Sequence, residues 1–90
     1  MATITNNSVK DMWNIEIVPV IASFDSTGHV RPLYVRLGEE SLKVVSSWIE
    51  YGFVNSCTYH CDLLVGDAIR PLELTYYFTE KVWAVPKNTR

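Results

Sequence analysis

Hydrophobic and polar residues alternate along most of this chain, and the alternation begins close to Trp13. Ile15 and Ile17 alternate with the polar residues Asn14 and Glu16. A repeat of two residues places successive side chains on opposite faces of a β-strand. We therefore expect a strand from about residue 13. An interruption follows at position 19, because the proline there cannot donate a ladder hydrogen bond.

The alternation is most regular between residues 57 and 63, where Thr58, His60 and Asp62 share one face of the expected strand. The opposite, apolar face carries Cys57, Tyr59, Cys61 and Leu63. A second regular alternation covers residues 72–78, and a shorter one covers residues 81–85. These patterns predict strands with one buried face and one solvated face.

The same short sequence motif occurs twice, each time after a turn rich in Asp and Gly. Residues 30–33 (Val-Arg-Pro-Leu) follow a turn at residues 25–28, and residues 69–72 (Ile-Arg-Pro-Leu) follow a turn at residues 66–67. Asp accepts local backbone hydrogen bonds and Gly tolerates a positive φ, so both turns have a physical basis. The copies indicate either an internal duplication or repeated use of one turn chemistry, and the sequence leaves both interpretations open.

The segments on either side of Gly38 differ in how clearly their pattern indicates a strand. Over residues 30–37 the alternation places Leu33, Val35 and Leu37 on the inner face. Residues 38–50 allow two structures. The β-branched pair Val44-Val45 favours a strand, whereas apolar residues at helical spacing would also allow an amphipathic helix. We predict a strand for residues 38–50.

These elements predict an all-β fold, a single antiparallel meander of five to six strands curled into a small SH3-like or OB-like barrel. A chain of 90 residues has room for one such domain. We place this domain at residues 13–86, after a polar lead-in at residues 1–12 and before a polar tail at residues 87–90.

Composition limits the classes of function. The formal net charge is −2, so the chain lacks the basic excess that neutralises phosphates, and this disfavours a nucleic-acid partner. The longest apolar run, at residues 17–22, is too short to cross a bilayer, and the polar N-terminus does not resemble a secretory signal. We expect a cytoplasmic protein without a membrane partner.

The strongest chemical motif is Cys57-Thr58-Tyr59-His60-Cys61, which could suggest a zinc site. In a strand, however, the two thiols would lie roughly 13 Å apart on one face, and His60 would point to the other face. This distance also excludes a disulfide between them. We expect two buried free cysteines, no metal, no cofactor and no enzymatic activity. A small hydrolase or metal protein is the least favoured class.

Aromatic residues provide the better indication of function. Tyr59, Tyr76, Phe78 and Trp83 lie on apolar faces and are expected in the core. The predicted partner-binding residues are those expected at the surface, namely Tyr34, Trp48, Tyr51, Phe53 and Tyr77. Exposed aromatic patches often mark interfaces. The sequence therefore predicts a non-catalytic binding or assembly module that engages a protein partner, possibly a second copy of itself. The alternative is single-stranded nucleic-acid binding on a barrel face.

One family resemblance supports the β interpretation. The segment Phe24-Asp25-x-x-Gly28-x-Val30-x-Pro32-Leu33, the central Tyr59-His60-Cys61 and the closing Trp83-x-Val85 resemble a group of short uncharacterised bacterial proteins. The resemblance covers about residues 15–85, and the chain departs from the pattern at residues 38–55, which are longer and more aromatic. It implies a small all-β domain and no particular activity.

Overall fold

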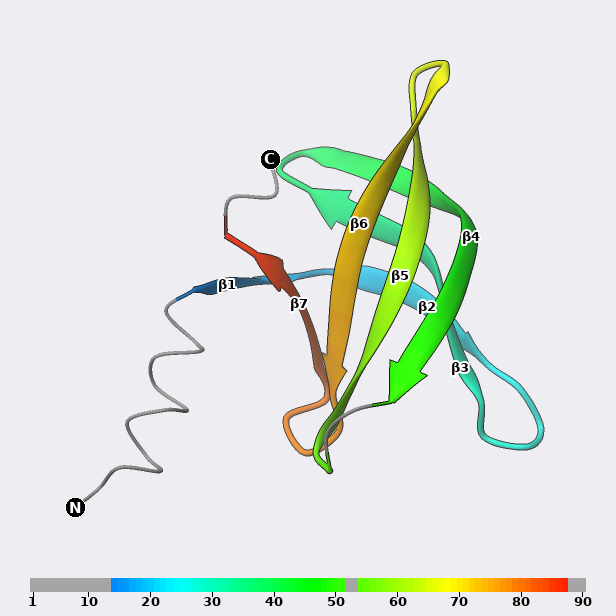
Figure 1. The fold of residues 1–90 in the computed structure, drawn as a ribbon, viewed down its shortest axis with the longest axis vertical. Coiled ribbons are helices and arrows are strands. Elements are labelled where there is room, and N and C mark those ends of the chain that lie inside the picture. The colour runs from blue at the N-terminus through cyan, green and yellow to red at the C-terminus, as the bar shows by residue number, and fades with distance from the viewer. Residues whose placement is uncertain (1–13, 52–53, 88–90) are drawn as a thin grey trace.

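The computed structural model describes residues 14–51 and 54–87. These residues form one antiparallel sheet of seven strands and no helix, which confirms the predicted all-β class (Figure 1). The strands are β1 (Ile15–Val18), β2 (Val20–Phe24), β3 (Val30–Leu37), β4 (Glu40–Tyr51), β5 (Ser56–Val65), β6 (Ala68–Tyr77) and β7 (Val82–Pro86). The lead-in predicted over residues 1–12 lies outside the described residues.

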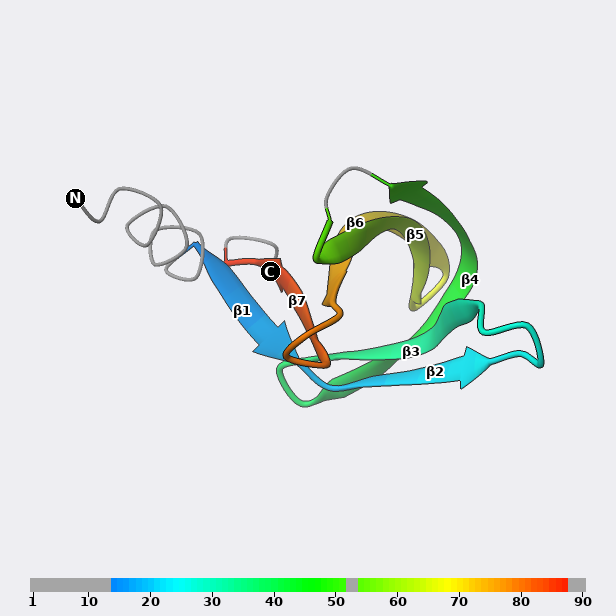
Figure 2. The same cartoon turned by 90° about the horizontal axis from the view of Figure 1, so that it is seen from below.

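The first two strands are one extended segment that is bent at Pro19, which explains why seven strands are found where five to six were expected. The segment pairs with β7 before the bend and with β3 after it. The Pro19 carbonyl accepts a hydrogen bond from the Arg36 N–H at 3.0 Å. Because the two ends of the sheet share this segment, the sheet curls into a small, incompletely closed barrel. Figure 2 shows the curved layer of β4, β5 and β6 above β3 and β2.

The core lies inside this curl and follows the predicted alternation of β5. Its buried residues include Cys57, Tyr59, Cys61, Leu63, Leu72, Leu74, Trp83 and Val85. The ring of Trp83 packs against Tyr59 and Tyr76, with centroid distances of 5.5 and 4.7 Å. Phe78 was also predicted in the core, and this is wrong. It lies just after the end of β6 and remains 43% exposed, because it lies beyond the paired strands.

A bulge changes the orientation of side chains in β3. Ile21 pairs with Tyr34, but the next residue, Ala22, pairs with Pro32, so Leu33 is left without a partner on β2. An unpaired extra residue shifts the alternation by one position. Pro32 is consequently buried, whereas Leu33, which was predicted to face the core with Val35, is only half-buried.

A second bulge shifts the alternation in β4. Val44 pairs with Leu63 and Ser46 pairs with Asp62, so Val45 is the extra residue. Beyond it, Ile49 packs against the core and the Trp48 side chain points outward. The twelve-residue strand also excludes the helix that the spacing of residues 42–49 had allowed.

The two Arg-Pro-Leu copies are not structurally equivalent. Pro32 is buried in β3, whereas Pro71 is exposed in β6 and pairs with Asp62 on the outer face. The proline of the same Arg-Pro-Leu motif therefore faces inward in β3 and outward in β6.

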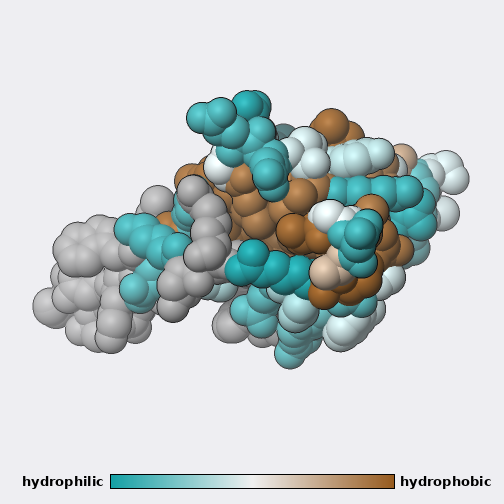
Figure 3. All heavy atoms as spheres, turned by 90° about the horizontal axis from the view of Figure 1, so that it is seen from above, coloured by the Kyte–Doolittle hydropathy of each residue, from teal (hydrophilic) through white to brown (hydrophobic). Residues whose placement is uncertain are grey.

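The β5–β6 hairpin extends beyond the rest of the sheet and leaves apolar side chains exposed at that end of the barrel. Leu64 and Ile69 pair across this hairpin, and both are exposed. Figure 3 looks onto this end and shows apolar side chains in the middle with polar ones around them. No helix within the described residues has the length and apolar character needed to cross a membrane.

Candidate functional site

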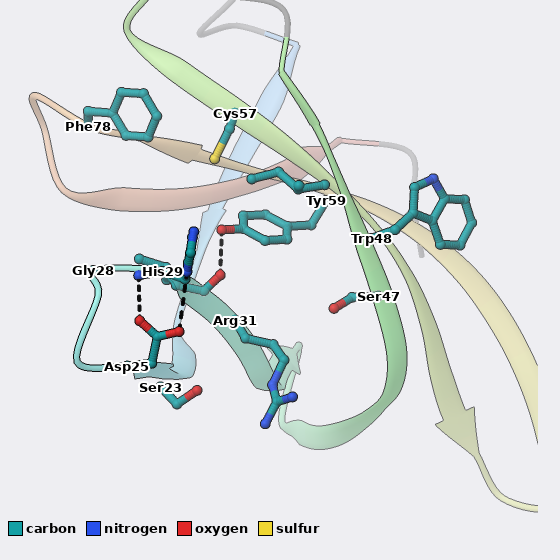
Figure 4. Close-up of a pocket in the computed structure, with 12 residues that line it drawn as sticks. Ser23, Asp25, Gly28, His29, Arg31, Ser47, Trp48, Cys57, Tyr59 and Phe78 are labelled. Carbon is teal, nitrogen blue, oxygen red and sulfur yellow. Dashed lines mark hydrogen bonds and ion pairs between the residues drawn. The ribbon is translucent and has the colours of Figure 1, made fainter.

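The sheet is open between β3 and β4, and this opening forms the candidate site. The two strands pair only where residues 34–37 face residues 40–43. Beyond that point β4 continues along β5, while the first part of β3 pairs only with β2. The strands therefore diverge and leave a groove of about 730 Å³, shown in Figure 4. We call this space the β3–β4 groove. Its lining is formed by Ser23, Asp25, Gly28, His29, Val30, Arg31, Ser47, Trp48, Ile49, Cys57, Tyr59 and Phe78.

Pro32 gives a physical reason for the divergence. The Asp25 N–H donates to the His29 carbonyl at 2.9 Å, in the turn directly beyond the Phe24–Val30 pair that ends the β2–β3 ladder. In an antiparallel ladder the bonded positions alternate, so Val30 and Pro32 direct their main-chain polar groups away from β2. Pro32 has no N–H to donate on that side. The edge of β3 that faces β4 therefore lacks one main-chain donor at Pro32, and this disfavours pairing with β4 there.

Tyr59 supplies the main connection across the opening. Its hydroxyl donates to the Val30 carbonyl at 2.7 Å, although the two residues belong to different parts of the sheet. The Tyr59 ring is 4% exposed and forms part of the floor of the groove. A side chain thus takes the place of a strand–strand hydrogen bond, and it holds the β2–β3 hairpin against β5.

The floor is apolar and includes a buried thiol. Ile49, Cys57 and Tyr59 line it from β4 and β5, and Phe78 lies at one side (Figure 4). Burial raises the pKa of the Cys57 thiol, and burial also raises that of Cys61, which lies deeper in the core, to about 11. Both thiols are therefore protonated at neutral pH, which makes them weak nucleophiles and weak metal ligands.

The rim on the β2–β3 side is a hydrogen-bonded turn centred on Asp25. One carboxylate oxygen accepts from the main-chain N–H groups of Thr27 at 2.9 Å and His29 at 2.8 Å, and from the Thr27 hydroxyl at 2.8 Å. The other oxygen lies 3.3 Å from His29 Nδ1. The hydrogen bonds from His29 and Thr27 lower the pKa of Asp25 to about 2. Gly28 completes the turn with φ of +88°.

On the β4 side the rim carries an ordered tryptophan. Trp48 points outward, away from Tyr59, and is 60% exposed (Figure 4). Its indole stacks on the imidazole of His60, its partner on β5, with centroids 5.3 Å apart and planes inclined by 20°. His60 Nε2 in turn lies 2.6 Å from Glu50 Oε1. These contacts hold the indole on one side while leaving most of its surface accessible.

The predicted partner-binding residues that the structure describes do not lie together. Trp48 is the one member of that set for which the described residues show a place in the groove. Tyr34 is 40% exposed but points outward from β3 opposite Ile21, and Tyr77 is half-buried at the end of β6. Phe53 and the side chain of Tyr51 lie outside the described part of the chain.

Sequence reasoning missed the contribution of Tyr59 to this site. Tyr59 was expected in the core, where it lies, but its hydroxyl could not be assigned a partner 29 positions away. The available signal was Pro32, since a proline inside a strand commonly marks the edge of a sheet.

No three His, Cys, Asp or Glu side chains within residues 14–51 and 54–87 are grouped closely enough to hold a metal ion. In comparisons with known proteins, no family model, no curated protein and no solved structure matches this chain. The assignment of function therefore depends on the geometry of the groove.

Proposed function

We propose that this protein is a non-catalytic binding module, and that an extended segment of a protein partner binds in the β3–β4 groove. The segment would add to the sheet as a strand alongside β4. In such recognition, main-chain hydrogen bonds provide affinity and alternate side chains provide specificity.

The observation that carries this proposal is the free edge of β4. From Ser46 to Glu50 this strand pairs with β5 on one side. On the other side, the described residues supply no main-chain hydrogen bond to it. Natural proteins usually cover or block such edges, because unpaired N–H and C=O groups attract another strand. Here the edge borders an open groove, which supports a binding role.

The side chains around this edge suit an extended ligand. A strand added to β4 would place its outward side chains beside Trp48 and its inward side chains near Ile49 and the floor. Exposed tryptophans that are already ordered are frequent anchors in interfaces. The volume of the groove also falls within the range of ordinary ligand sites.

Single-stranded nucleic acid is the weaker candidate for this surface. The register places Trp48, His60 and Glu73 side by side on the outer face, with Glu50 and Asp62 on the same face. Three carboxylates around the exposed indole oppose the approach of phosphates. Arg31 is the one Lys or Arg among the described lining residues.

A displayed library of random peptides, selected on the whole protein, tests the proposal. We expect enriched peptides whose affinity, measured by calorimetry, falls at least about tenfold in Trp48→Ala. Tyr34→Ala is the matched control, since it removes an exposed aromatic outside the groove, and it should bind as the wild type does. Failure to enrich any peptide, or equal binding by Trp48→Ala, would overturn the proposal.

Self-association through the groove is a distinct outcome, and a second experiment detects it. Sedimentation of the wild type and of Trp48→Ala at several concentrations would detect it. A dimer that depends on Trp48 and competes with the selected peptides would identify a second copy of this chain as the partner.

A further inference from the structure

We infer that the segment bound in the β3–β4 groove carries one Asp or Glu residue between two apolar residues, and that this acidic side chain pairs with Arg31. This inference rests on the proposed function and specifies the chemistry of the partner.

Arg31 is the uncompensated charge of the groove. It is exposed on β3, where its main chain pairs with Ser23, and within the part of the chain that the structure describes its side chain has no hydrogen bond or ion pair. The other charged groups of the lining are already engaged, because Asp25 is paired with His29 and bonded to the turn. Figure 4 shows this difference, since the dashed lines join Asp25 to its neighbours and none reaches Arg31. A carboxylate is the group that would compensate Arg31, through a bidentate pair.

The alternation follows from the two sides of the opening. The floor consists of Ile49, Cys57 and Tyr59, and the Tyr59 hydroxyl is already bonded to the Val30 carbonyl, so the inward side chains of the ligand should be apolar. Arg31 belongs to the outer face of β3, because its neighbour Pro32 is buried. In an extended segment, neighbouring side chains point to opposite faces. An acidic residue between two apolar residues would therefore reach Arg31 while both neighbours contact the floor.

The choice of main-chain partner for the ligand is also restricted. Since β3 and β4 run antiparallel, a strand lying between them must be antiparallel to one and parallel to the other. The Val30 carbonyl is already occupied by the Tyr59 hydroxyl. The free edge of β4 is therefore the better main-chain partner, and Arg31 on the opposite side contributes through its side chain.

The test uses peptides selected on the wild type and resynthesised with an amidated C-terminus, so that a terminal carboxylate cannot replace the acidic side chain. We expect an acidic residue between apolar ones in the enriched peptides. Replacement of that residue by its amide, or Arg31→Gln in the protein, should lower the affinity about tenfold. Arg36→Gln is the matched control, because Arg36 is exposed on the same strand outside the groove lining.

A charge exchange separates the ion pair from a general effect on folding. Arg31→Glu should lose the acidic peptide and bind a peptide in which lysine replaces the acidic residue. If selected peptides depend on Trp48 but show no acidic preference and no response to Arg31→Gln, this inference is wrong and the proposed function stands. Loss of binding on C-terminal amidation would likewise overturn it in favour of a terminal carboxylate. If no peptide is enriched, both proposals fail.

Discussion

At the scale of single residues, Asp25 organises the turn that forms one rim of the groove. Its carboxylate accepts main-chain hydrogen bonds from Thr27 and His29, and both oxygens take part in the network. These bonds favour the charged form of the carboxyl, which is why its pKa falls to about 2. The turn is therefore maintained by an ionised aspartate, not by burial.

This pKa predicts how stability depends on pH. Because the folded-state pKa is depressed, the unfolded chain binds more protons between the two pKa values, so stability rises with pH there. The contribution of Asp25 should be complete above its ordinary pKa of 3.8, and it should be lost as pH falls towards about 2. Urea unfolding of the wild type and of Asp25→Asn across this range measures it. A carboxyl that titrates near 3.8 by NMR, or an identical pH dependence in both proteins, would contradict it.

At the scale of elements, the two bulges decide which side chains face the core. Each adds one unpaired residue, Leu33 in β3 and Val45 in β4. Past each bulge the alternation is shifted, so Pro32 becomes buried and Trp48 faces outward. The groove depends on both changes, because they end the β3–β4 ladder and place the indole beside the free edge.

The two prolines of the repeated Arg-Pro-Leu motif provide a matched pair of variants. Pro32→Ala removes two buried methylene groups and should destabilise the fold by about 1.5–2 kcal/mol more than Pro71→Ala, whose ring is exposed. The change in the entropy of the unfolded chain is common to both substitutions, so the difference reports burial. Urea midpoints measure the effect. Equal destabilisation by the two substitutions would contradict this difference in burial between the two prolines.

At the scale of the whole molecule, an aromatic cluster joins the first and last strands to the centre of the sheet. Trp83 on β7 contacts Tyr59 and Tyr76, and it pairs with Val18 on β1. The bent segment of β1 and β2 is thereby attached to the core at the point where the sheet curls back. The same cluster borders the groove, because Tyr59, which Trp83 contacts, lines its floor.

We expect the tryptophans to differ strongly in their effect on stability. Trp83→Ala should cost about 3–5 kcal/mol, a large part of the stability of a domain of this size. Trp48→Ala should cost about 0.5 kcal/mol, since that side chain is mostly exposed. Chemical unfolding followed by circular dichroism measures both. A similar loss in the two variants would show that Trp48 supports the fold, and it would disqualify Trp48→Ala as a test of binding.

The strands and most of the core were predictable from local pattern. Side chains of β5 alternate without interruption, so Tyr59 and Cys61 could be assigned to the core from spacing alone. The turns at residues 25–28 and 66–67 were likewise apparent, because Asp and Gly have specific uses in turns. The finer assignment to an SH3-like or OB-like barrel, and a cytoplasmic location, stay predictions.

The alternating sequence by itself determined the fold class, since a period of two residues suits only a pleated strand with one buried face. The tertiary structure alone decided where β3 and β4 separate and which groups face that opening. Bulge positions depend on the register with a neighbouring strand, and the bond from Tyr59 to Val30 joins residues far apart in the chain. Both are long-range effects, which no local pattern of hydrophobic and polar residues encodes.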